Sequence, residues 1–257
     1  MRKTMTIALK DLRAYFVSPI GYTVLSVFLL LTGWLFNGLI NRYIMITMYY
    51  QQMGNPSAFR DFNLNTQILT PFFHNMVFVF IFIVPLFTMR LFAEERKMRT
   101  DELLMTLPLE DIHILMGKFF AGLSFLGIVL ISTVVFPILL VIYGNPDVGP
   151  IFSGYLGVFL VGAAFVSVGL FASFTTENQV VAAIVSFVIF LLLYLININV
   201  PEAESSFKSV LMYLSLFDQM DSFAKGLIAL PNIVYLVSFC VLGLFLGKIA
   251  IEIRRWR

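Results

Sequence analysis

Long, uninterrupted blocks of apolar residues constrain the fold of this chain more than any other feature of its sequence. A helix needs roughly 20 apolar residues to cross the ~30 Å hydrocarbon core of a bilayer. Six such blocks occur, at 20–40, 72–92, 112–143, 151–174, 180–198 and 233–251. The sequence therefore predicts an all-α, polytopic membrane protein with six transmembrane helices. The third block exceeds one crossing, which predicts a tilted helix or a first turn at the interface.

Composition and charge exclude several other classes. Charged residues make up 12% of the 257 residues, whereas soluble domains usually carry about 25%. Lysine and arginine sit between the apolar blocks rather than in one stripe, and the net charge is only +2, so we expect no nucleic-acid partner. The single cysteine, Cys240, excludes an internal disulfide and a cysteine-based metal site.

The positions of the basic residues predict how the chain is oriented. Thirteen of them lie in the N-terminal segment, the connection between the second and third blocks, and the C-terminal end, and four lie in the alternate connections. Cytoplasmic connections carry the excess of lysine and arginine. We therefore expect a protein of the bacterial inner (cytoplasmic) membrane with both termini in the cytoplasm.

Residues 1–18 have the pattern of an amphipathic helix. Its apolar residues recur at helical spacing, while charged residues point elsewhere around the helical wheel. The apolar set is Met5, Ala8, Leu9, Leu12 and Phe16, and the charged set is Lys3, Lys10 and Asp11. Ser18-Pro19 predicts a bend after this helix, which would lie in the cytoplasmic interface. The alternative is that these residues simply begin a long first helix.

The connection 94–108 is charged and rich in helix-forming residues. Leu103 and Leu107 would share one helix face, and Pro108 would end the helix. The pattern predicts a helical cytoplasmic loop, although an ordinary solvated connection would have a similar composition.

Residues 201–231 are too polar to form a span of their own, yet they contain apolar patches at 210–217 and 227–230. Such a segment can form short helices that rest against the outer leaflet when its backbone is buried in protein. A simple external loop is the alternative.

The sequence lacks the residue patterns that would indicate a phosphate-binding loop, a shared metal site or an ion pathway. Gly117-Lys118 and Gly247-Lys248 lack the remaining residues of a phosphate-binding loop. His74 and His113 are separated by a whole span and would lie near opposite faces of the membrane. The middles of the spans carry essentially no ionisable residues, which counts against an ion-coupled carrier. We expect no catalytic, cofactor-binding or metal-binding residues, and we expect Pro85 and Pro137 to interrupt helices.

The order of these features resembles the ABC-2 family of permeases over nearly the whole chain. The family pattern is close to E-E-R-x-x-G-T-x-E-L-L-x-x-L-P. Its matches here are Glu94, Glu95, Arg96, Thr100, Glu102, Leu103, Leu104, Leu107 and Pro108, followed by Gly117-Lys118-Phe119. Arg99 stands where the family usually has glycine. The resemblance implies that 94–108 is a coupling helix that docks into an ATPase subunit.

A second matching segment precedes the last span and implies an external helical hairpin over 201–231. It contains Ser215, Phe223 and Gly226. Within the family, the chain is most similar to permeases associated with gliding motility, and that likeness implies an additional membrane subunit with an extracytoplasmic domain.

The resemblance implies a permease of an ATP-driven transporter of the exporter type that has no ATPase site of its own. ATP and magnesium would be bound by a separate cytoplasmic ABC ATPase. A second permease chain would complete a homodimer or heterodimer in the lipid bilayer. The alternative function is a membrane anchor or force-coupling scaffold that moves no substrate.

Overall fold

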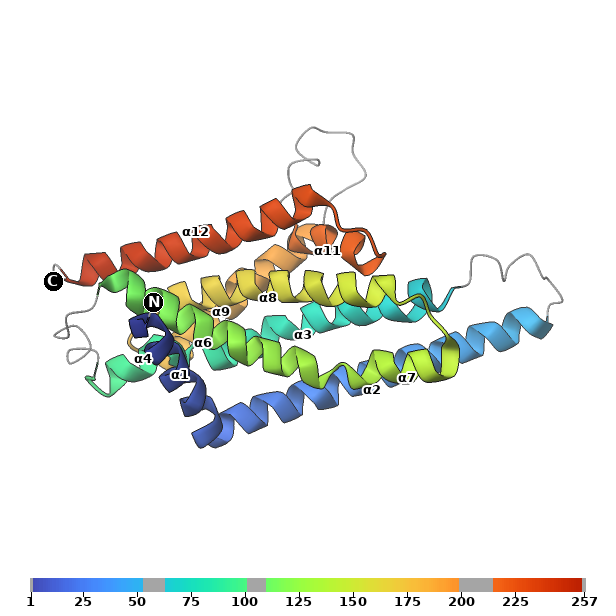
Figure 1. Cartoon of the computed structure of the whole chain (residues 1–257), viewed down its shortest axis with the longest axis horizontal. Coiled ribbons are helices and arrows are strands. Elements are labelled where there is room, and N and C mark those ends of the chain that lie inside the picture. Colours follow the sequence, from blue (N-terminus) through green and yellow to red (C-terminus); the bar gives the residue numbers. More distant parts are fainter. Residues whose placement is uncertain (1, 53–62, 101–109, 199–214, 256–257) are drawn as a thin grey trace.

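The computed structural model describes residues 2–52, 63–100, 110–198 and 215–255, and the secondary structure of these residues is helical throughout (Figure 1). In chain order the elements are α1 Arg2–Val17, α2 Pro19–Gln52, the short π-helix η2 Asn65–Leu69, α3 Thr70–Thr88, α4 Arg90–Lys97, α6 Asp111–Ser132, α7 Val135–Gly144, α8 Gly149–Thr175, α9 Gln179–Ile198, α11 Leu216–Ala224 and α12 Leu230–Arg255.

Five stretches of this helical structure are long and apolar enough to cross a membrane. They are Pro19–Gln52, Asn65–Lys97, Asp111–Gly144, Gly149–Thr175 and Leu230–Ile253. Within α9, Gln179–Leu195 forms a shorter apolar helix. The structure therefore supports a multi-pass, all-helical membrane protein with five candidate spans, and the sixth span stays a prediction.

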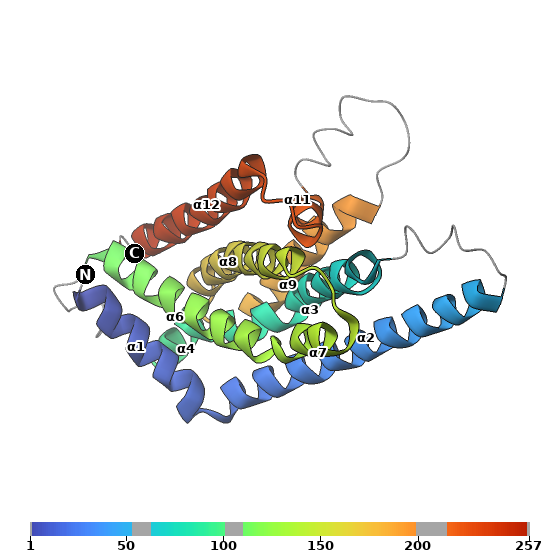
Figure 2. The same cartoon turned by 45° about the vertical axis from the view of Figure 1, so that its right-hand side comes forward.

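The long helices run beside one another, and α8 lies at the centre of the bundle (Figures 1 and 2). It packs against α3, α6, α9, α11 and α12, and most of its residues are buried. Both α1 and the last turns of α12 lie at one end of the bundle, whereas α11 lies at the other (Figure 1). We call these the α1 end and the α11 end.

The predicted bend at Ser18-Pro19 is confirmed, because α1 and α2 are separate helices that meet at a sharp corner (Figure 2). The apolar residues of α1 are divided between exposed and buried positions. Met5 and Leu9 are exposed, while Ile7 is buried. Asp11, which we expected on the polar side, points inward to an ion pair with α6. A helical wheel registers polarity but not a buried partner on another helix.

The third apolar block is divided into α6 and α7 rather than forming one long helix. The break lies at Thr133 and Val134, four and three residues before Pro137. Proline has no N–H for the carbonyl four residues earlier, and its ring collides with that carbonyl. The Thr133 carbonyl instead accepts a bond from the N–H of Phe136 at 3.0 Å. Pro85, by contrast, lies inside α3, which continues to Thr88.

The predicted helix over 94–108 is interrupted. The helix α4 ends at Lys97, and Arg99 adopts a left-handed conformation with φ of 55°. The Arg99 N–H donates to the Arg96 carbonyl at 3.0 Å, and the Thr100 N–H donates to the Glu95 carbonyl at 2.9 Å. This pair of bonds is the usual closure of a helix around a left-handed residue. Residues 101–109 lie outside the described part of the chain.

The left-handed residue gives a first prediction, that Arg99→Gly stabilises the protein. A residue with a Cβ in this conformation costs about 1 kcal/mol relative to glycine, which corresponds to a rise in melting temperature of roughly 2 °C for a chain of this size. Thermal unfolding in one detergent measures the change. Met98→Gly is the matched control, because Met98 has an ordinary φ of −88° and glycine there costs conformational entropy. A lower melting temperature for Arg99→Gly would contradict the prediction.

Candidate functional site

A buried lysine joins three helices at the α1 end. Lys118 on α6 is fully buried. Its Nζ lies 3.2 Å from Asp11 Oδ2 on α1 and 2.7 Å from Glu95 Oε2 on α4, and it also donates to the Leu91 carbonyl. A buried charge is strongly unfavourable unless it is paired and hydrogen-bonded. The positions of α1 and α4 are therefore tied to α6.

A second lysine completes the cluster from the solvent side. Lys10 Nζ lies 2.7 Å from Glu95 Oε1 and 3.3 Å from Asp11 Oδ1. Burial would lower the pKa of Lys10, but the carboxylates of Glu95 and Asp11 raise it above its ordinary value. Lys10 therefore stays charged at neutral pH. We call Lys10, Asp11, Glu95 and Lys118 the charge cluster.

Close packing beside the charge cluster holds α1 in place. The buried Tyr15 hydroxyl donates to the Phe87 carbonyl at 2.9 Å, and its ring stacks on Phe125 with the ring centres 4.7 Å apart. Burial raises the pKa of Tyr15 well above its usual value, so the hydroxyl remains a donor. Gly117 allows α6 to approach α1 closely, since an added Cβ would lie 2.8 Å from the side chain of Ile7.

The opposite side of α4 is fixed to the end of α8. Ser173 Oγ accepts bonds from the N–H groups of Phe92 and Ala93 at 3.1 and 3.0 Å, and it donates to the Met89 carbonyl at 3.1 Å. These N–H groups belong to the first turn of α4, where a helix leaves donors without partners of its own. One serine on α8 thus satisfies the start of α4.

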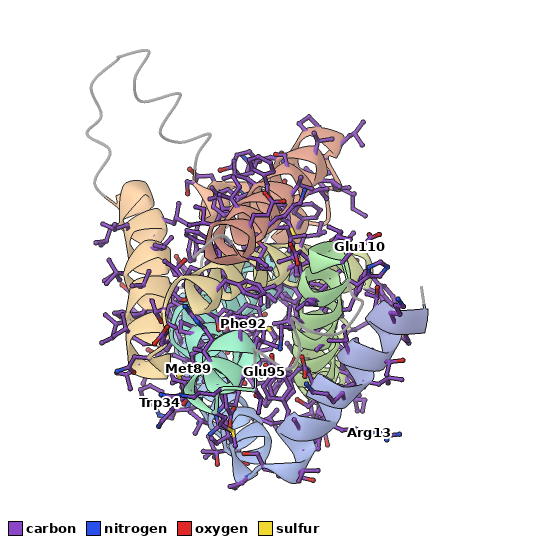
Figure 3. All side chains as sticks on the ribbon, turned by 90° about the vertical axis from the view of Figure 1, so that its left-hand side faces the viewer. Arg13, Trp34, Met89, Phe92, Glu95 and Glu110 are labelled. Atoms are coloured by element: carbon purple, nitrogen blue, oxygen red, sulfur yellow. The ribbon has the colours of Figure 1, made fainter. Side chains whose placement is uncertain are left out.

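Arg96 strengthens the same contact. Its Nη1 donates to the Phe174 carbonyl at 3.1 Å, and its Nη2 lies 3.3 Å from Glu177 Oε1. The ring centres of Phe92 and Phe174 are 4.4 Å apart. Figure 3 views the α1 end, where Phe92 and Glu95 of α4 and the preceding Met89 lie near the middle and Arg13 of α1 points away. The short helix α4 is therefore held by α1 and α6 on one side and by α8 on the other.

The structure places only part of the predicted coupling segment. Glu94 Oε2 lies 3.8 Å from Arg90 Nε, and Thr100 Oγ1 donates to the Glu95 carbonyl at 3.2 Å. The remaining residues of the predicted set lie outside the described part of the chain, namely Glu102, Leu103, Leu104, Leu107 and Pro108.

Sequence reasoning missed the charge cluster. Lys118 was counted among the basic residues of a cytoplasmic connection, and Gly117-Lys118 was noted as an incomplete phosphate-binding loop and as part of the family pattern. The available signal was its position within α6, seven residues after Asp111. An ionisable residue inside an apolar helix predicts a partner, and the partners prove to be Asp11 and Glu95.

A cleft of about 490 Å³ opens between α1 and α4 beside the cluster. Lys10, Asp11, Arg90, Glu94 and Glu95 are among its lining residues, and Tyr15 and Leu91 contribute apolar surface. Charges of both signs around an apolar floor suit a polar protein contact better than a small apolar ligand.

The predicted hairpin residues meet at the α11 end. Ser215 is buried, and its Oγ accepts a bond from the Asp218 N–H at 3.4 Å, which caps α11. The Phe223 carbonyl accepts a bond from Ser153 Oγ at 2.7 Å, and Gly226, with φ of 91°, lies close to the ring of Pro150. The described part of the segment therefore forms a short helix docked on the start of α8.

The described residues show no grouping of three or more histidine, cysteine or acidic side chains that would suit a metal ion. His74 lies 4.0 Å from Asp221 at the α11 end, whereas His113 lies 3.7 Å from Glu110 at the α1 end. The two histidines do not share a site.

Comparison with known proteins gives one family and no curated relative. A search of curated proteins returns no significant match. Residues 5–251 match the family described as ABC-2 family transporter protein. Because the match extends from α1 into the last turns of α12, the chain belongs to the ABC-2 transporter family.

Proposed function

We propose that this chain is the membrane-spanning permease subunit of an ATP-driven exporter and that a separate ATPase drives it through residues 94–108. Members of the family are membrane subunits that generally partner with a cytoplasmic ATPase. The observation that supports this role best is the anchoring of α4. Its residues are fixed to α1, α6 and α8 immediately before 101–109.

The anchoring of α4 suggests how force would reach the membrane. The partner ATPase would hold ATP and magnesium, and its cleft would receive residues 94–108. A displacement of α4 would act on α6 through the Glu95–Lys118 pair and on α8 through Arg96 and Ser173. Closure of two ATPases would then rock two permease chains against each other, a rigid-body type of transition.

A second prediction tests the coupling. Glu94→Ala and Leu103→Asp should leave membrane insertion intact and reduce ATP hydrolysis stimulated by the permease. Leu103→Asp should have the larger effect, about 1–2 kcal/mol of docking free energy, because it would put a charge at an apolar interface anchor. ATPase assays on the reconstituted assembly measure both variants. Glu252→Ala is the control, because Glu252 is exposed near the end of α12. Unchanged stimulation in both test variants would refute the coupling role.

A third prediction concerns orientation. The distribution of basic residues supports a cytoplasmic α1 end. In a Cys240→Ser background, a cysteine at Asn55 should react with an impermeant maleimide in intact cells, whereas one at Thr100 should react only after permeabilisation. Labelling of the Thr100 position from outside would reverse the proposed topology.

The likeness to gliding-motility permeases supports a role in gliding for the proposed exporter. Purification of the tagged chain in nanodiscs, followed by mass spectrometry, would identify its partners. A stoichiometric ATPase together with a subunit bearing an extracytoplasmic domain is the expected result. Reproducible recovery without any ATPase would favour a stand-alone scaffold.

A further inference from the structure

A second cavity is chemically very different from the cleft beside α4. It forms a groove of about 710 Å³ between α6, α7 and α8. Its walls include Ile131, Val134 and Ile138 on one side and Phe152, Leu156 and Phe159 on the other. Tyr155 contributes the only hydroxyl among the lining side chains, and this hydroxyl lies 3.1 Å from Thr133 Oγ1 within hydrogen-bonding distance. The groove therefore presents hydrocarbon and no charge.

The half-helix α7 forms one wall of this groove and is loosely held. Only Pro137 and Leu140 of its ten residues are buried. Its opposite face borders another cavity, of about 540 Å³, lined partly by Leu139 and Tyr143. The break at Thr133 and Val134 separates α7 from α6. The short helix thus stands between two apolar spaces, and its position can adapt to what fills them.

We propose that the groove between α7 and α8 holds one hydrocarbon chain of a membrane phospholipid. The groove opens on surfaces that belong to two candidate spans, and Ile131 and Phe152 on its walls are 72% and 75% exposed. Its volume lies within the ~300–1,000 Å³ typical of small-molecule sites. The Tyr155 hydroxyl is already bonded to Thr133, so the lining residues that the structure describes offer no free polar group. A hydrocarbon chain, which has no polar groups, therefore complements the groove walls.

Packing chemistry favours a lipid chain over a helix from a second copy. Helices associate in membranes through small residues that let their backbones approach. The groove walls instead carry large branched and aromatic side chains, and Gly127 is their only glycine. A second chain would also have to fill cavities on opposite faces of one ten-residue helix, whereas lipid reaches both faces from the surrounding bilayer.

Retention of a brominated acyl chain tests the proposal. In a Trp34→Phe, Trp256→Phe background, Leu156→Trp places a fluorophore in the groove, and Val237→Trp on α12 is the matched control. Leu156 and Val237 each lie seven residues from the start of their helix and are 39% and 45% exposed. The full chain is reconstituted with phospholipid that carries brominated acyl chains, which quench tryptophan on contact. It is then extracted into excess ordinary detergent.

The expected result is that both tryptophans are quenched in the vesicles, but only Leu156→Trp keeps most of its quenching after extraction. Gly127→Leu should abolish this retention by filling the groove, since an added Cβ at Gly127 meets no atom within 4 Å. Equal recovery of both tryptophans would overturn the proposal by showing only exchangeable lipid. Absence of quenching at Leu156→Trp in the vesicles would overturn it by showing that protein covers the groove. A melting temperature for the Gly127→Leu chain close to that of the unsubstituted chain would verify that this variant is folded.

Discussion

Lys118→Met should lower the stability of the protein by about 3 kcal/mol, because it removes the buried partner of the Asp11 and Glu95 carboxylates and leaves them only the exposed Lys10. Those carboxylates are 11% and 17% exposed, so water replaces the lost ion pair poorly. Methionine preserves most of the side-chain length, which limits the contribution of lost packing. Thermal unfolding in a mild detergent should show a fall of more than roughly 6 °C.

Lys248→Met is the matched control for this experiment. Lys248 belongs to α12, lies toward the α1 end, and pairs with Glu252 at 3.2 Å, but both side chains are about half exposed. Exposed pairs of this kind contribute about 0–1 kcal/mol. Equal melting temperatures for the two variants would show that the charge cluster contributes little to stability.

A double substitution separates the ion pair from packing. Glu95→Gln in the Lys118→Met background removes the carboxylate that has lost its buried partner and keeps only the exposed Lys10, and it should recover part of the lost stability. Residues that share one ion-pair network couple by about 0.5–3 kcal/mol in such cycles. Purely additive losses would mean that Lys118 acts through its alkyl chain rather than through its charge.

If α4 transmits force to the helix bundle, loss of the charge cluster should also reduce transport. In variants that still assemble, Lys118→Met should let the ATPase bind while transport per ATP falls. Such a separation of binding from output distinguishes Lys118, a positioning residue inside the bundle, from Glu94 and Leu103, which are proposed to contact the partner.

The helices were predictable because the bilayer imposes length and hydrophobicity on each crossing, and these properties are visible in a single sequence. The bend at Ser18-Pro19 was predictable for a similar reason, since proline acts on its immediate neighbours. The break before α7 follows the same local rule, but the length of the block had suggested tilt as the explanation. Hydrophobicity and the local effects of proline thus located the helices, the bend and the break, but they gave less information on how these elements are oriented.

The site was less predictable because its contacts join residues far apart in sequence. Ser173 caps α4 from a distance of about 80 positions, as its bond to Ala93 shows. Asp11 looked like a solvent-facing residue until Lys118 supplied its partner. Arg99 was recognised only as a departure from the family glycine, and its left-handed conformation explains why glycine suits that position. Pairings of this kind require the tertiary structure.

The contact between α8 and α11 gives the other large expected effect, because Gly157 leaves no space for a side chain. A Cβ added there would lie 2.6 Å from Phe223 Cβ and 2.7 Å from Met220 Sδ, and both of these residues are fully buried. Gly157→Leu should therefore push α11 away from α8 and break the bond between Ser153 Oγ and the Phe223 carbonyl. We expect a loss of about 3 kcal/mol, the upper part of the usual range for overpacking.

Gly38→Leu is the control, because it makes the same substitution at a glycine that has open space around it. An added Cβ at Gly38 on α2 meets no atom within 4 Å, and replacing a mid-helix glycine with a good helix former gains up to about 1 kcal/mol. Melting temperatures should move in opposite directions in the two variants. Hydrogen exchange should rise over residues 216–224 only in Gly157→Leu, since α11 alone loses its support. Protection of α11 as strong as in the unsubstituted chain would mean that α11 is held by contacts other than its packing on α8.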